Sequence, residues 1–156
     1  MRILVLSDSH GNYYSARRAL MAHSEAQVVV HCGDGARDVE DLRCEFPQRM
    51  IVSVRGNCDF CTDCPDTQVI NIEGKRIFIA HGHNYGVKGG LYRLCCAARE
   101  QQADIVLFGH THIPLSVYDE GLYILNPGSV GGYPGSYGLV DIEESGVVTN
   151  TATLRD

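Results

Sequence analysis

Short apolar runs alternate with helix-like segments in the first third of the chain. Three of these runs have the length and continuity of a buried strand: residues 2–7, 27–31 and 50–54. The segments between them, residues 13–24 and 36–44, are predicted to be helical, with Asn12 as the N-cap of the first helix. Strands that alternate with helices in this way predict a parallel sheet flanked by helices.

The second part of the chain has a different pattern. Two strand-like segments, residues 67–72 and 75–80, flank Glu73-Gly74, a pair that is typical of a two-residue hairpin turn. A helix near residues 90–102 and a strand at residues 104–108 follow. Four more strands are predicted near residues 114–119, 122–125, 137–142 and 146–153, with turns at Glu120-Gly121 and Ser145-Gly146. The chain is therefore expected to form two mixed sheets packed face to face, with helices outside.

Length and composition narrow the class of protein. With 156 residues, of which 44% are hydrophobic, the chain can bury a core, and we expect one domain over residues 1–156. Its formal net charge of −6 argues against a large basic surface, so no stable nucleic-acid partner is expected. A small phosphorylated substrate stays compatible with this charge, because bound metal ions would add positive charge locally.

We expect a cytoplasmic protein with no membrane partner. No apolar stretch approaches the length that crosses a bilayer, and the N-terminal run is too short for a signal peptide. The seven cysteines then indicate reduced thiols instead of a disulfide framework.

Acidic, amide and imidazole side chains stand where five of the apolar runs end. Oxygen and nitrogen ligands of this kind suit hard or borderline divalent cations, and there are more of them than one ion needs. They are Asp8, His10, Asp34, Asn57, His81, His110 and His112. The pattern predicts a site for two metal ions, which at a separation of about 3.5–4 Å can share a hydroxide and clamp a phosphoryl oxygen.

Local spacing suggests how these ligands are presented. Asp8 and His10 are two positions apart, so in an extended segment both side chains would point the same way. Asp34 follows a glycine and is the natural carboxylate to bridge two ions. Taken alone, Asn57-Cys58-Asp59 has a simpler interpretation as an Asx-type turn. Two other histidines are expected to be structural: His23 and His31.

Five short blocks carry these residues in chain order: Asp8-Ser9-His10, Gly33-Asp34-Gly35, Gly56-Asn57-Cys58-Asp59, His81-Gly82-His83 and Gly109-His110-Thr111-His112. The set resembles the motifs of the calcineurin-like metallophosphoesterase superfamily. The Gly-Asn-Cys-Asp form, the stretch from His81 to Lys88, and Asn126-Pro127-Gly128-Ser129 are similar to its YfcE/MJ0936-type branch of small phosphodiesterases. The resemblance extends from residue 1 to about residue 142.

This resemblance implies a fold and a reaction. The fold is an α/β four-layer αββα sandwich of two mixed β-sheets flanked by helices. One ion would be held by Asp8, His10, Asp34 and His112, and the second by Asp34, Asn57, His81 and His110. The reaction would be hydrolysis of a small phosphodiester by a metal-bridging hydroxide, with Asn57 also contacting the phosphate. Mn²⁺ is the first expectation for the two divalent ions, and Ni²⁺, Zn²⁺ and Fe²⁺ also suit these ligands.

One position departs from the superfamily pattern. Many members carry His where this chain has Cys58, and that His helps to protonate the leaving group. A thiol is a poor replacement, so aryl leaving groups, which need no protonation, should react best. His83 is the candidate for the missing acid, and it joins Asp34 and Asn57 in the expected catalytic set. Asn12 is either a contact for the substrate phosphate or simply the helix cap.

Three alternatives stay open. A phosphomonoesterase or nucleotidase would use the same ligands and differ in the shape of its pocket. A Vps29-like non-catalytic scaffold would share the fold but have a degraded metal site, whereas here all seven ligands are present. Cys58, Cys61 and Cys64, with Cys95-Cys96, could hold an iron–sulfur or zinc cluster, although thiols of a loop are the simpler interpretation. A homo-oligomer, either a dimer or a tetramer, is compatible with this branch of the superfamily.

Overall fold

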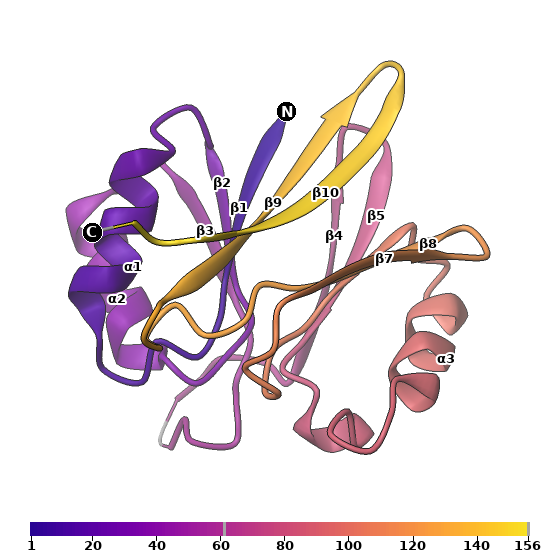
Figure 1. Ribbon diagram of the computed structural model, residues 1–156, viewed down its shortest axis with the longest axis horizontal. Coiled ribbons are helices and arrows are strands. Elements are labelled where there is room, and N and C mark those ends of the chain that lie inside the picture. Colours follow the sequence, from indigo (N-terminus) through magenta and orange to yellow (C-terminus); the bar gives the residue numbers. More distant parts are fainter. Residues whose placement is uncertain (61, 156) are drawn as a thin grey trace.

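The first of two five-stranded sheets contains the N-terminal strands, in the order β10-β9-β1-β2-β3 (Figure 1). This computed structural model describes residues 1–60 and 62–155. The strands are β1 (Arg2–Leu6), β2 (Val28–His31), β3 (Met50–Ser53), β9 (Ser136–Glu143) and β10 (Gly146–Thr153). β1, β2 and β3 are parallel to one another, whereas β9 is antiparallel to both of its neighbours, β1 and β10. The sheet is therefore mixed, as expected.

The second sheet has the order β4-β5-β6-β8-β7. Its strands are β4 (Thr67–Ile72), β5 (Lys75–Ala80), β6 (Ile105–Leu107), β7 (Leu115–Asp119) and β8 (Leu122–Asn126). The three central strands are parallel, and β4 and β7 pair antiparallel at the two edges. This sheet is also mixed.

Helices cover the outer face of each sheet (Figure 1). α1 (Tyr13–Ala22) and α2 (Ala36–Glu45) pack on the first sheet, and α3 (Tyr92–Glu100) packs on the second. The four layers confirm the predicted αββα sandwich. Among the described residues, no helix is both long and apolar enough to cross a membrane.

Alternating residues of each inner strand serve two different cores. In β1, Ile3 and Val5 pack between the sheets, while Leu4 and Leu6 pack under the helices. Both faces of the strand are covered, so both sets of side chains are buried. This explains why the strand reads as a continuous apolar run instead of an alternating one.

The turns agree with the sequence prediction at two of three hairpins. Glu73 and Gly74 both have positive φ, 49° and 75°, as a two-residue primed turn requires. Glu120-Gly121 repeats this pattern, with φ of 42° and 85°. The third turn is displaced by one residue, because Glu143 pairs with Gly146 and leaves residues 144–145 as the loop. A short 3₁₀ helix, η1 (His83–Tyr85), was not predicted.

The parallel strands determine where the loops meet. β1, β2 and β3 end at one edge of the first sheet, and β5 and β6 end at the same side of the second (lower edge in Figure 1). Because carboxyl ends of parallel strands share an edge, the five loops that carry the predicted ligands converge there.

Candidate metal centre

All seven predicted ligands lie together at this edge. Two groups of three side chains each have their ligand atoms within 4.8 Å of one another: Asp8, His10 and His112 in the first, and Asp34, His81 and His110 in the second. His10 and Asp34 form a further group with Cys58, which links the two. Oδ1 of Asn57 lies 3.0 Å from Nε2 of His81. The arrangement agrees with two neighbouring ion sites.

The contacts of His81 test whether a cation fits. Its Nδ1–H donates to the carbonyl oxygen of Cys32 at 2.7 Å, and a carbonyl can only accept. In the neutral imidazole, Nε2 therefore carries a lone pair, which faces Oδ2 of Asp34 at 3.3 Å and Oδ1 of Asn57 at 3.0 Å. Oxygen atoms and a ring nitrogen that face one another are stabilised by a positive charge between them: a proton on Nε2 in the metal-free protein, or a divalent cation that replaces this proton.

A similar convergence occurs in the first group. The Nε2 atoms of His10 and His112 are 3.4 Å apart. Both face Oδ1 of Asp8, at 3.6 Å and 3.1 Å respectively. The other carboxylate oxygen of Asp8 accepts hydrogen bonds from the hydroxyl of Ser7 and the backbone N–H of His110. Asp8 is thus fixed on one side and free to bind an ion on the other.

The electrostatics of the second group favour positive charge at its centre. Burial lowers the pKa of His81, but the hydrogen bond to Asp34 and the charge of Asp8 outweigh burial and raise the pKa. Burial would also raise the pKa of Asp34, yet hydrogen bonds from His81 and the Cys58 backbone hold it below its usual range. Burial and the neighbouring His81 lower the pKa of His110, which keeps that imidazole in the neutral form that binds metals.

Five of the seven predicted ligands have a left-handed backbone, with φ of 54° at Asp8, 46° at His10, 59° at Asp34, 68° at His110 and 61° at His112. Such conformations are uncommon outside glycine and cost about 1–3 kcal/mol each. The expected extended Asp8-Ser9-His10 segment is therefore wrong. Backbone hydrogen bonds between loops hold the observed conformation, from Asp8 N–H to Gly33 at 2.9 Å and from His10 N–H to Asp34 at 3.0 Å.

Space requires glycine at several positions of the sequence blocks, among them Gly56 and Gly109. A Cβ at Gly56 would overlap Oδ1 of Asp34, and one at Gly109 would overlap the Oγ of Ser7. Any side chain at either position would displace a carboxylate or its hydrogen-bond donor.

Comparison with known proteins identifies the family. The model of the calcineurin-like phosphoesterase superfamily domain matches residues 1–145. The chain belongs to the calcineurin-like phosphoesterase superfamily. It is 34% identical to "Probable metallophosphoesterase YsnB" of Bacillus subtilis over 131 residues, which cover 83% of this chain and 75% of YsnB. It is 31% identical to phosphodiesterase YfcE of Escherichia coli K12, with 95% of this chain and 91% of YfcE covered.

Solved structures of the superfamily share the fold. A predicted phosphoesterase from Streptococcus pneumoniae TIGR4 superposes with a TM-score of 0.81 and 29% identity, covering 97% of this chain and 88% of that one. Vps29 of Entamoeba histolytica, in complex with Zn²⁺, superposes with a TM-score of 0.75 and 25% identity, covering 98% of this chain and 99% of the Vps29 chain.

Other residues that the superfamily motifs single out lie around the ligands. The ring of His83 is 5.3 Å from that of His81 and 6.1 Å from that of His110. Asn57 points at His81 instead of closing an Asx-type turn. Asn12 caps α1, since its Oδ1 accepts the Ser15 N–H at 3.2 Å, and this contact supports the simpler of its two roles.

The cysteines give little support to a metal cluster within the described part of the chain. None of the candidate ligand groups there contains two cysteines. Cys64 contacts the hydroxyl of Ser53, and Cys95 and Cys96 lie on α3. Cys61 lies outside the described residues. The six described cysteines are free thiols, as expected.

Sequence reasoning missed the role of Asp59. Its carboxylate accepts four backbone N–H groups, from Asp34 and Gly56 at 2.8 Å, from Ala36 at 2.9 Å and from Gly35 at 3.0 Å. Asp59 thus joins the Asp34 loop to the Asn57 loop and satisfies free N–H groups at the start of α2. The sequence did show a carboxylate two residues after Asn57, but the interpretation of Asn57-Cys58-Asp59 as an Asx-type turn gave Asp59 no contact with the Asp34 loop.

A buried network behind the ligands was also missed. The Gly33 N–H donates to Nδ1 of His31 at 3.2 Å, so Nε2–H of His31 is the donor to Oγ of Ser9 at 3.1 Å. The Ser9 hydroxyl donates in turn to Asp38 at 2.6 Å, and the Gly11 N–H donates to the same oxygen. His31 is thus structural, as expected, and supports both the Asp8–His10 and the Asp34 loops. His23, at the end of α1, contacts Glu25 away from the site.

The network predicts a pH-dependent stability. Burial lowers the pKa of His31 below the usual value of 6.5, so the stability from neutral His31 is present above pH 6.5 and lost as the pH falls below it. The free energy of unfolding of the wild type should therefore fall relative to His31→Gln between pH 7.5 and 5.5, with a limiting slope of about 1.4 kcal/mol per pH unit. Urea unfolding of metal-free protein measures this difference. Parallel pH curves for the two proteins would contradict it.

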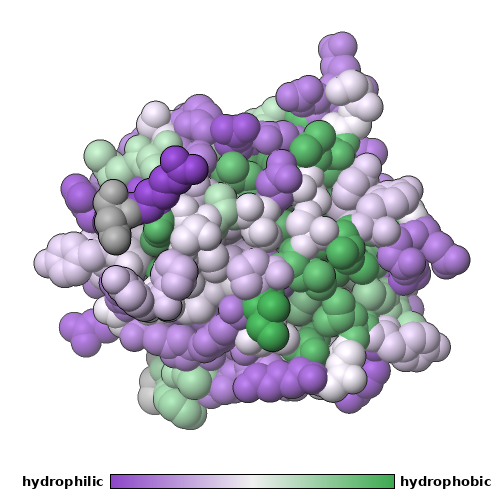
Figure 2. Space-filling view, viewed as in Figure 1, coloured by the Kyte–Doolittle hydropathy of each residue, from purple (hydrophilic) through white to green (hydrophobic). Residues whose placement is uncertain are grey.

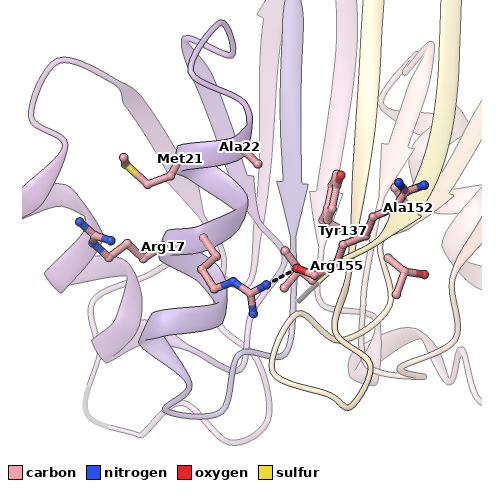
Figure 3. Close-up of a pocket in the computed structure, with 9 residues that line it drawn as sticks. Arg17, Met21, Ala22, Tyr137, Ala152 and Arg155 are labelled. Carbon is pink, nitrogen blue, oxygen red and sulfur yellow. Dashed lines mark hydrogen bonds between the residues drawn. The ribbon is translucent and has the colours of Figure 1, made fainter.

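A large cavity elsewhere does not contribute to this site. It has a volume of about 750 Å³ and lies between α1 and the end of β10 (Figure 3). Two of its three arginines have partners: Arg17 is paired with Glu45, and Arg18 donates to the backbone carbonyl oxygen of Arg155, the third. The cavity contains none of the seven ligands.

Proposed function

We propose that this protein is a metal-dependent phosphodiesterase that hydrolyses a small phosphodiester at a centre for two divalent ions. The observation that carries the proposal is the convergence of Nε2 of His81 with the oxygens of Asp34 and Asn57, at 3.3 Å and 3.0 Å. Membership of the superfamily and the phosphodiesterase name of the relative YfcE support it. Mn²⁺ is the first ion to test, and residues 1–156 are proposed to form one domain.

The seven ligands divide between two positions that share Asp34. We assign Asp8, His10, Asp34 and His112 to one ion, and Asp34, Asn57, His81 and His110 to the other. When bound, such ions polarise a phosphoryl oxygen and lower the pKa of water. The side chain of Asn57 is exposed beside them, so its amide can also donate to the phosphate.

The groups around the ligands favour esters whose leaving group needs no proton. Burial and the charge of Asp34 raise the pKa of Cys58, so its thiol is a weak acid near neutral pH. Burial and His81 lower the pKa of His83, so little of it carries a proton to donate. Aryl phosphodiesters should therefore be cleaved faster than alkyl phosphodiesters.

His112→Ala is expected to lower kcat for Mn²⁺-dependent hydrolysis of bis(p-nitrophenyl) phosphate by roughly a hundredfold, because one ion loses an imidazole ligand. The side chain is half exposed, so the fold should survive. Release of p-nitrophenolate and the bound metal content measure the two effects. His23→Ala, remote from the ligands, is the control and should keep wild-type turnover.

Other outcomes would redirect the assignment. Full turnover of His112→Ala with unchanged metal content would show that the ligand set is wrong. Faster hydrolysis of p-nitrophenyl phosphate than of the diester by the wild type would favour the phosphomonoesterase alternative. If the protein hydrolysed neither ester with Mn²⁺, Ni²⁺, Zn²⁺ or Fe²⁺, the non-catalytic scaffold would be favoured.

A further inference from the structure

An apolar pocket of about 410 Å³ is lined in part by Thr111, in the loop that carries His110 and His112. Its apolar lining comes from the segment between η1 and α3, from the segment between β6 and β7, and from the first residue of β7: Val87, Leu91, Phe108, Ile113 and Leu115. Figure 2 shows apolar side chains on the surface over the side of the molecule where β7 and β8 lie. The volume lies within the roughly 300–1,000 Å³ of small-molecule sites, so an aromatic ring has room in it.

The pocket is continuous with the ligand-bearing loops. Thr111, which lines it, stands between His110 and His112 in the chain. Phe108 forms another part of the lining, two residues before His110. Val87 packs against Gly82, the residue that follows His81, where a Cβ would meet its Cγ2 at 2.8 Å. A molecule held by the metal ligands could therefore extend into this pocket.

The lining offers little for polar recognition. The Thr111 hydroxyl oxygen already accepts hydrogen bonds from Nδ2 of Asn126 at 3.0 Å and from the Ile113 N–H at 3.2 Å. Lys88 is the single charged residue of the lining, and it is exposed. A nucleobase or sugar would leave polar groups unpaired against such walls, whereas an apolar ring would not.

We propose that the apolar pocket is a substrate subsite that holds an apolar, ring-sized ester group, while Lys88 at its rim attracts the phosphoryl oxygens. This inference rests on the proposed function and specifies its substrate class. The natural substrate would then be a phosphoester with one aromatic or comparably apolar substituent. Thr111 and Ile113 would be specificity residues, because they connect the subsite to His110 and His112.

Binding of two non-hydrolysable phosphonates tests the subsite without relying on turnover. Phenylphosphonate and methylphosphonate carry the same phosphoryl group and differ only in the apolar substituent. Calorimetric titration of Mn²⁺-loaded protein should give about tenfold tighter binding of phenylphosphonate, because its ring enters the pocket. Measurement at a pH where both phosphonates are dianions removes any difference in charge.

Substitutions in the pocket lining test whether the preference for phenylphosphonate arises there. Ile113→Ser and Leu115→Ser should each lower the phenyl-to-methyl affinity ratio severalfold, and Ile113 is 68% exposed, so the fold should tolerate its truncation. Val117→Ser is the matched control, because Val117 lies on β7 with Leu115 but outside the pocket, and this change should leave the ratio unchanged. Lys88→Gln should weaken the binding of both phosphonates to a similar extent.

The outcomes separate the two proposals. Equal affinity of wild-type protein for both phosphonates, or an unchanged ratio in Ile113→Ser and Leu115→Ser, would overturn the subsite and leave the phosphodiesterase proposal standing. Failure of the Mn²⁺-loaded protein to bind either phosphonate would also overturn the subsite, whereas the phosphodiesterase proposal is overturned only by absence of turnover of bis(p-nitrophenyl) phosphate.

Discussion

Asp34→Asn is expected to lower kcat for metal-dependent phosphodiester hydrolysis by roughly a thousandfold or more. Asp34 belongs to two of the three candidate ligand groups, and its Oδ2 faces Nε2 of His81 at 3.3 Å and Nε2 of His10 at 3.7 Å. The amide keeps the size of the side chain but removes the charge that offsets two cations. Both ion positions should therefore be weakened together.

The measurement combines turnover of bis(p-nitrophenyl) phosphate with the number of Mn²⁺ ions bound per chain. We expect the bound metal to fall along with turnover. Asp41→Asn, an exposed carboxylate on α2, is the matched control and should retain both. Normal metal content and turnover in Asp34→Asn would show that Asp34 does not bridge two ions.

Asp59→Ala is expected to lower the free energy of unfolding by about 2–4 kcal/mol. The change removes the acceptor of four backbone N–H groups, those of Asp34, Gly35, Ala36 and Gly56. Water can replace only part of this loss, because Gly35 and Gly56 are buried. The loops that carry Asp34 and Asn57 would also separate, so metal affinity should fall as well.

Urea unfolding of metal-free protein measures the stability effect, and titration with Mn²⁺ measures the affinity. Asp63→Ala, an exposed carboxylate further along the same loop, is the control and should change neither. If Asp59→Ala unfolded at the wild-type urea concentration, the carboxylate would not be the clamp that its contacts describe.

Much of the fold could be predicted from local sequence. Continuous apolar runs predicted the inner strands correctly, because both faces of each sheet are covered and both sets of side chains are therefore apolar. Glu73-Gly74 predicted its hairpin because Gly74 readily adopts the positive φ that the second turn position needs, and Glu73 adopts a positive φ beside it. The Ser145-Gly146 turn was placed one residue late, since strand pairing between β9 and β10 and not local propensity sets that register.

The predicted helix near residues 90–102 illustrates the limit of local pattern. α3 begins only at Tyr92, after Gly89 and Gly90, and ends at Glu100. The preceding 3₁₀ turn at residues 83–85 is bounded by Gly82 and Gly86, both left-handed. This turn lies next to the apolar pocket, whose lining no single segment contains. A pocket made by three separate segments leaves no periodic signal in any one of them.

The sequence by itself determined which atoms could bind a cation and that five strand ends deliver them. That follows from residue type and from the parallel arrangement that strand–helix alternation requires. Only the tertiary structure decided how these atoms converge. Asp8 and His10 converge with His112 through left-handed backbone, held by hydrogen bonds to the loop after β2. Asp59 and the His31–Ser9–Asp38 network fix the same loops. These contacts join residues that are distant in the chain, so no local pattern could encode the geometry.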